Sequence, residues 1–176
     1  MLKKHEGRLN FMKLIKLLYL ADRKSLLETG KPITGDRMVA MPKGPVLSGI
    51  LDLIIWGRRR GETCVWLEYI SEPVGYDVTF AAEWVAIDEL DRISELERQI
   101  LDEIDEAFGG IDKWSLVELT RRLPEWRDPR GSSFPIDPAD ILREESRSEQ
   151  EIRRIARNAE RALFLQDLDR LEIEPE

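Results

Sequence analysis

The segment Asn10–Gly30, NFMKLIKLLYLADRKSLLETG, contains the first long helical pattern of this 176-residue chain. Its apolar residues recur every three or four positions, which places them along one face of an α-helix. Asn10 suits the N-cap, Gly30 can take the left-handed conformation that ends a helix, and Pro32 cannot continue one. We therefore predict a helix from about Asn10 to Thr29, with an apolar face formed by Phe11, Leu14, Ile15, Leu17, Leu18, Ala21 and Leu26.

Two apolar segments follow this helix. Met38–Met41 is a short run that fits an edge strand. Gly44 and Pro45 precede a longer apolar run, and proline is favoured at the first position of a helix. We expect a second helix from Pro45 to near Gly57, with the three arginines at 58–60 at the negative end of its dipole.

The segments Val65–Ile70 and Val74–Phe80 are rich in β-branched and aromatic residues. They are separated by the turn-forming sequence Ser71-Glu72-Pro73. This pattern predicts a β-hairpin. A hairpin alone is marginally stable, so we expect it to pack on the helices or to pair with the 38–41 segment.

The second half of the chain carries four helix-start signals. A Ser-x-x-Glu capping box, in which each side chain satisfies a free backbone donor of the other residue, occurs three times. An Asp-Pro pair gives the fourth signal. We expect helices to begin at Ser94, Ser115, Asp137 and Ser148.

These elements predict a mainly α fold: a compact bundle of about six helices with a small β-hairpin or short antiparallel sheet. We assign residues 1–147 to one helical domain. Residues 148–176 form a C-terminal helix that either packs on the domain or acts as an arm or homo-oligomer contact.

Composition excludes several classes of protein. Hydrophobic residues make up 42% of the chain, enough for a core, and no run is long enough to span a membrane. The first residues lack the apolar stretch of a signal peptide, so we expect a cytoplasmic protein. With one cysteine, Cys64, and one histidine, His5, the chain has no internal disulfide, and most zinc sites and Ser-His-Asp triads are excluded.

The net charge of −8 is unevenly distributed. Residues 1–60 hold 13 Lys and Arg against 5 Asp and Glu, whereas residues 61–176 hold 14 against 30. We favour solvated helix faces as the explanation. The alternatives are that the acidic part meets a basic protein, or that basic residues bind nucleic acid phosphates, with Lys13, Lys16, Lys43 and the arginines at 58–60 as the contacts.

Groups suited to catalysis are sparse. The chain has no glycine-rich phosphate loop and no clustered Asp-x-Asp pattern, so we predict no metal and no cofactor. A hydrolase that uses Asp22 with a divalent ion stays as a minor hypothesis. Most tryptophans are expected in the core, but Trp126 follows Pro124 in a polar loop, where it either anchors the loop or contacts a partner.

Three segments together resemble a known family. They are Met12–Arg23, then Gly30–Asp36 with Lys43–Val46, and finally Leu119–Trp126. In this order, over roughly residues 9–142, they are similar to the Panacea domain, the SocA-like antitoxin and adaptor family of bacteria and phages. Arg121 stands where the family often has histidine.

The resemblance implies a mainly helical, non-catalytic domain that neutralises a separately encoded toxin by direct binding. In the SocA branch it also implies delivery of the toxin to the ClpXP protease. Other members are phage-associated proteins without a defined role. For the signature residues we favour architecture over direct toxin contact; the candidates are Lys16, Tyr19, Asp22, Arg23, Lys43, Gly44, Pro45 and Trp126.

Overall fold

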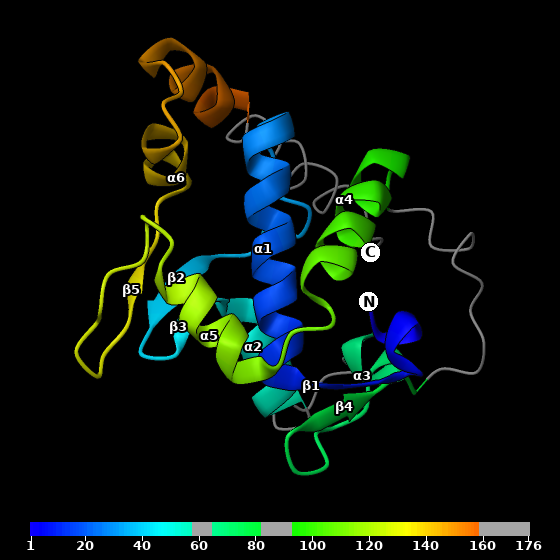
Figure 1. Cartoon of the computed structure of the whole chain (residues 1–176). Coiled ribbons are helices and arrows are strands. Elements are labelled where there is room, and N and C mark those ends of the chain that lie inside the picture. The colour runs from blue at the N-terminus through cyan, green and yellow to red at the C-terminus, as the bar shows by residue number, and fades with distance from the viewer. Residues whose placement is uncertain (58–64, 82–92, 159–176) are drawn as a thin grey trace, which may run out of the picture.

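Helix α1 (Phe11–Thr29) is the axis of the fold. A computed structural model describes residues 1–57, 65–81 and 93–158 of the chain. Figure 1 shows α1 in the middle of the molecule, with helix α4 (Glu95–Phe108) on one side and the three-stranded sheet on the other. The central position explains why most residues of α1 are buried, including the polar residues Lys16, Asp22 and Ser25.

The predicted ends of α1 are confirmed. The Asn10 side chain accepts a 3.2 Å hydrogen bond from the backbone N–H of Met12, and Gly30 ends the helix with φ at 79°. Leu17 and Tyr19 are fully buried. They belong to two different apolar clusters, so α1 separates two halves of the core.

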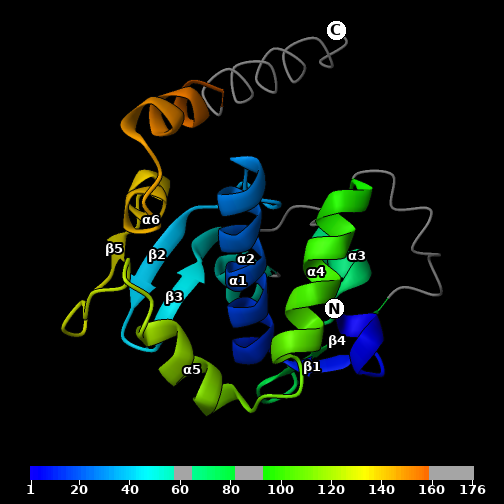
Figure 2. The ribbon, with the colours of Figure 1, turned by 45° about the horizontal axis from the view of Figure 1, so that its top comes forward.

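The sheet on one side of α1 has the order β3–β2–β5 and is antiparallel. Its strands are β2 (Met38–Met41), β3 (Gly44–Leu47) and β5 (Phe134–Pro135). The 38–41 strand is therefore present, but as the central strand rather than an edge. Figure 2 shows helix α5 (Lys113–Arg121) near one end of this sheet and helix α6 (Pro138–Glu144) near the other.

The prediction of a helix starting at Pro45 is wrong. Residues 44–47 pair with β2, and helix α2 (Ser48–Trp56) begins after them. The two carboxylate oxygens of Asp36 accept hydrogen bonds from the N–H groups of Gly49 (3.0 Å) and Ile50 (2.8 Å). The helix start is set by this distant carboxylate and by strand pairing, not by the proline. The arginines at 58–60 and Cys64 lie outside the described residues.

The predicted hairpin over 65–80 is also wrong in its first half. Helix α3 (Val65–Tyr69) replaces the first strand, and only an isolated bridge joins Ile70 to Phe80. Strand β4 (Asp77–Thr79) pairs instead with β1 (Arg8–Asn10), which follows a short 3₁₀ helix, η1 (Leu2–His5). The buried pair Leu9 and Val78 at the centre of this ladder explains the choice, because strand preference depends on what the side chains pack against.

The capping box that begins α4 is confirmed, since Ser94 and Glu97 satisfy each other's backbone donors. Helix α5 begins earlier than predicted. Its N-cap is Asp112, which accepts from the backbone N–H groups of Trp114 and Ser115. Ser115 thus lies in the first turn, where its hydroxyl also donates a hydrogen bond to the Asp112 carboxylate.

The last two helix starts are confirmed. Asp137 caps α6 by accepting a 2.8 Å hydrogen bond from Ala139 N–H, and Ser148 and Glu151 exchange hydrogen bonds before the helical residues 149–158. Ile152 in that helix is buried against the core. The fold is mainly α with small antiparallel sheets, as predicted. Among the described helices, none has both the length and the apolarity needed to cross a membrane.

Candidate functional site

Four of the signature residues lie on α1, and the structure divides them among three polar contacts with other segments. Tyr19 and Arg23 meet the loop after α5, Lys16 meets β3, and Asp22 meets the loop after α1. The helical repeat explains why Tyr19 and Arg23, four positions apart, meet the same loop, because such residues share a face of the helix.

Tyr19, Arg23, Glu125 and Glu145 form the Glu125 network. The Tyr19 hydroxyl and the Arg23 Nε–H each donate a 2.8 Å hydrogen bond to Oε1 of Glu125. Arg23 also donates to Glu145, at 2.8 Å. The Glu125 side chain has no exposure and that of Arg23 has 12%, so this ion pair is shielded from water. Through Arg23, the network joins α1 to the loop after α5 and to the residue after α6.

The network keeps Tyr19 and Arg23 protonated. Burial, reinforced by the nearby Glu125 carboxylate, raises the pKa of Tyr19 above its ordinary value, so the hydroxyl remains a hydrogen-bond donor. Burial acts to lower the pKa of Arg23, but the hydrogen bonds to Glu125 and Glu145 raise it overall. Arg23 and Glu125 thus form a structural ion pair, and the Tyr19 hydroxyl donates a further hydrogen bond to its carboxylate.

Lys16 is buried, with 1% of its surface exposed. Its Nζ donates a 2.6 Å hydrogen bond to the carbonyl of Pro45, and burial lowers its pKa to about 7. Lys16 was also predicted as a phosphate contact; that prediction is wrong, because the side chain does not reach the surface.

Gly44 is required at its position for two reasons. Its φ is +86°, and a Cβ there would lie 2.7 Å from Oγ1 of Thr120 and 3.0 Å from Nζ of Lys16. Thr120 is itself fully buried and donates to the carbonyl of Leu116. Gly44 and Pro45 therefore let β3 approach both α1 and α5 closely.

Asp22 is fully buried and binds Thr34. Its two carboxylate oxygens accept from the backbone N–H of Thr34, at 3.0 Å, and from the Thr34 hydroxyl. Burial raises the pKa of Asp22, and the hydrogen bonds from Thr34 oppose the shift. In the described residues, no group of three or more His, Cys, Asp or Glu is placed to hold a metal ion. Asp22 thus acts as a cap on the loop after α1.

Trp126 anchors its loop. Its indole N–H donates a 3.1 Å hydrogen bond to the carbonyl of Met41, at the end of β2. The guanidinium of Arg121 lies over the ring, 4.8 Å from its centroid. Of the two roles predicted for Trp126, loop anchoring is the one these contacts describe.

Lys43 is separate from these buried contacts. It is exposed on the turn between β2 and β3, with its Nζ 5.6 Å from the ring centroid of Trp114. Of the basic residues proposed for nucleic acid, Lys13 donates to the carbonyl of Gly109. Lys43 therefore remains as the exposed member of that set among the described residues.

Four partners of the signature residues were not predicted from the sequence: Thr34, Thr120, Glu125 and Glu145. The first three stand within the segments quoted for the family resemblance, but no role was assigned to them. For Glu125 a signal was present, since a carboxylate that is buried beside Trp126 needs a cation to pair with. Glu145 had no comparable signal.

Fold and site together define a mainly helical domain in which buried polar contacts hold the central helix α1 against strand β3 and against the loop after α5. The chain belongs to the antitoxin SocA-like, Panacea domain family, whose model matches residues 14–127. The matched region contains every signature residue from Lys16 to Trp126. No curated protein and no solved structure matches the chain.

Proposed function

We propose that this chain is an antitoxin of the cytoplasm: a non-catalytic module that neutralises a separately encoded toxin by binding it. The observation that carries the proposal is the family match over 14–127, which spans the whole signature cluster. A protein partner follows from membership of this family, and the toxin itself is to be sought among neighbouring gene products.

The state of the signature residues supports a binding role over a chemical one. Lys16 donates to a backbone carbonyl, Asp22 caps a loop and Tyr19 remains a protonated donor. Each side chain has a partner within the chain. These residues therefore serve to hold a rigid scaffold, and the surface that this scaffold presents is the functional part.

Co-expression tests the proposal. The neighbouring toxin is induced alone, with the unaltered chain, or with Leu17→Asp, which places a charge at a fully buried position. We expect the unaltered chain to restore growth and to co-purify with the toxin, and the Leu17 variant to do neither. Absence of both rescue and co-purification with the unaltered chain would contradict the proposal.

A second experiment asks whether the chain is also a proteolytic adaptor. If it delivers the toxin to ClpXP, the half-life of the toxin should shorten when the chain is present, and only in cells that contain ClpX. If the chain acts by occlusion alone, the half-life should be the same or longer in both strains. The comparison with and without ClpX separates the two modes of neutralisation.

A further inference from the structure

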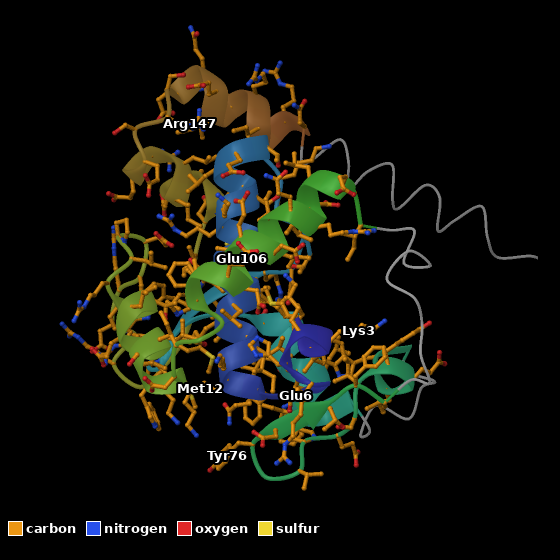
Figure 3. All side chains as sticks on the ribbon, turned by 45° about the vertical axis from the view of Figure 1, so that its right-hand side comes forward. Lys3, Glu6, Met12, Tyr76, Glu106 and Arg147 are labelled. Atoms are coloured by element: carbon orange, nitrogen blue, oxygen red, sulfur yellow. The ribbon has the colours of Figure 1, made fainter. Side chains whose placement is uncertain are left out.

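An apolar groove lies near the start of α1, at the end of the molecule where Figure 3 shows Met12 and Tyr76. Its volume is about 350 Å³, and its walls include Phe11 and Ile15 of α1, Val46 of β3, and Leu51 and Ile55 of α2. This volume is at the low end for ligand sites, so it suits one or two side chains rather than a large cofactor.

Three large apolar side chains are exposed at or beside the groove: Ile55 and Tyr76 line it, and Trp114 lies next to the lining residue Lys43. Ile55 is 45% exposed, Tyr76 is 65% exposed and Trp114 is 54% exposed. Tyr76 packs against Phe11, with 6.0 Å between the ring centroids. Aromatic residues around an apolar pocket are the composition found at the centre of protein interfaces.

The cations beside these rings set the charge of the mouth. Lys43 Nζ lies over Trp114, and Lys113 Nζ lies 5.5 Å from the ring centroid of Tyr76 and 5.8 Å from that of Trp114. Neither lysine forms an ion pair with a carboxylate in the described parts of the chain. The nearby Asp112 carboxylate instead caps the N-terminus of α5, where it accepts hydrogen bonds from two backbone N–H groups.

We propose that this groove binds a segment of the toxin that carries a large apolar side chain flanked by acidic residues. The apolar side chain fills the groove, and the flanking carboxylates pair with Lys43 and Lys113. The choice of an acidic occupant rests on charge complementarity, because a basic segment would bring like charges together at a desolvated surface. The inference rests on the proposed antitoxin function.

Matched variants of the full chain test the proposal, with the affinity for the toxin measured by calorimetry. The double variant Lys43→Glu/Lys113→Glu should weaken binding by about tenfold or more. The control Lys31→Glu/Arg153→Glu changes the net charge equally at exposed positions near the opposite end of α1, and its affinity should equal that of the unaltered chain. The affinity of the unaltered chain should also fall between low and high salt, and that of the double variant should fall less.

An apolar pair tests the groove independently of charge. Ile55→Ser should weaken binding, whereas Leu96→Ser, at a position on α4 with a similar 48% exposure, should not. Melting temperatures identify any variant that fails to fold. If Lys43→Glu/Lys113→Glu and Ile55→Ser both bind the toxin as tightly as the unaltered chain does, the groove assignment is overturned and the antitoxin function stands. If the unaltered chain does not bind, both fail.

A photo-reactive amino acid in place of Tyr76 identifies the occupant. We expect it to cross-link to a toxin peptide with more Asp and Glu than Lys and Arg, and the same group at Leu96 to give no such product. Cross-linking to a basic toxin segment, to a second copy, or to the acidic residues 159–176 of the same chain would overturn the proposal.

Discussion

The Tyr19 hydroxyl donates a 2.8 Å hydrogen bond to Oε1 of Glu125, which lies 106 residues further along the chain. The same oxygen accepts from Arg23, one helical turn after Tyr19. One buried carboxylate thus fixes the loop after α5 against two successive turns of α1. This loop also carries Trp126, so its position decides how α5 and the β2–β3 turn meet.

Removal of the tyrosine hydroxyl tests this connection. A hydrogen bond to a charged group contributes about 1.5–3 kcal/mol, so Tyr19→Phe should lower the free energy of unfolding by roughly 2 kcal/mol. The control is Tyr76→Phe, at a tyrosine that is 65% exposed, which should change it by less than about 0.5 kcal/mol. Urea denaturation measures both. Equal stability of the two variants would show that the Glu125 network does not hold the loop.

The buried amine of Lys16 should make stability depend on pH. Burial lowers its pKa from 10.5 to about 7. Between these values the unfolded chain holds a proton that the folded chain has lost, so the free energy of unfolding rises with pH across this window. Below about pH 7 Lys16 is protonated in both the folded and the unfolded state, so the folded chain carries the full free-energy cost of a buried charge.

The comparison with Lys16→Met isolates this effect, because methionine does not titrate. The difference in unfolding free energy, wild type minus variant, should increase by several kcal/mol from pH 7 to pH 10. Other titrating groups are common to both proteins and cancel. A pH-independent difference would refute the buried, neutral amine.

The close approach of β3 to α1 and α5 predicts a specific effect of a single methyl group. Gly44→Ala places a Cβ against Thr120 and Lys16, in a backbone conformation with φ at +86°. Gly35→Ala is the matched control, because Gly35 has φ at +65° and no atom within 4 Å of the position that a Cβ would take. Both variants carry a conformational cost of about 1 kcal/mol. Because of the additional steric contact, Gly44→Ala should lower the free energy of unfolding by at least about 1 kcal/mol more than Gly35→Ala. Urea denaturation of the two variants measures the difference.

Two tryptophans should separate architecture from partner contact. Trp126→Ala removes the hydrogen bond to Met41 and the stacking with Arg121, so stability should fall by about 2 kcal/mol. Trp114→Ala, at a ring that is 54% exposed, should leave the melting temperature almost unchanged and weaken toxin binding. The opposite pattern would assign the contact role to Trp126.

The C-terminal segment can be tested at Ile152, which is 3% exposed. Ile152→Ala should lower the free energy of unfolding by about 2–4 kcal/mol if the helix at 149–158 packs on the domain in solution. Arg153→Ala, at the exposed neighbouring position, serves as the control. No loss of stability in the Ile152 variant would indicate an arm that does not contribute to the core.

Much of the fold could be predicted from the sequence, because its signals are local. The ends of α1, the capping box at Ser94 and the Asp-Pro start of α6 depend on residues within one turn of each other. The failures are non-local. The sequence of residues 44–47 predicts a helix start, but these residues form a strand, since they pair with β2 and Pro45 accepts a hydrogen bond from Nζ of Lys16.

The candidate site shows the same contrast between local signals, which can be predicted from the sequence, and non-local contacts, which cannot. The family resemblance singled out the signature residues from the sequence alone, and the composition predicted few groups suited to catalysis. Their partners could be found only in the folded chain, because Tyr19 and Glu125 are 106 positions apart and Lys43 and Trp114 lie on different elements. Side-chain pairing over such separations depends on how the helices pack, and packing is a property of the whole core rather than of any segment.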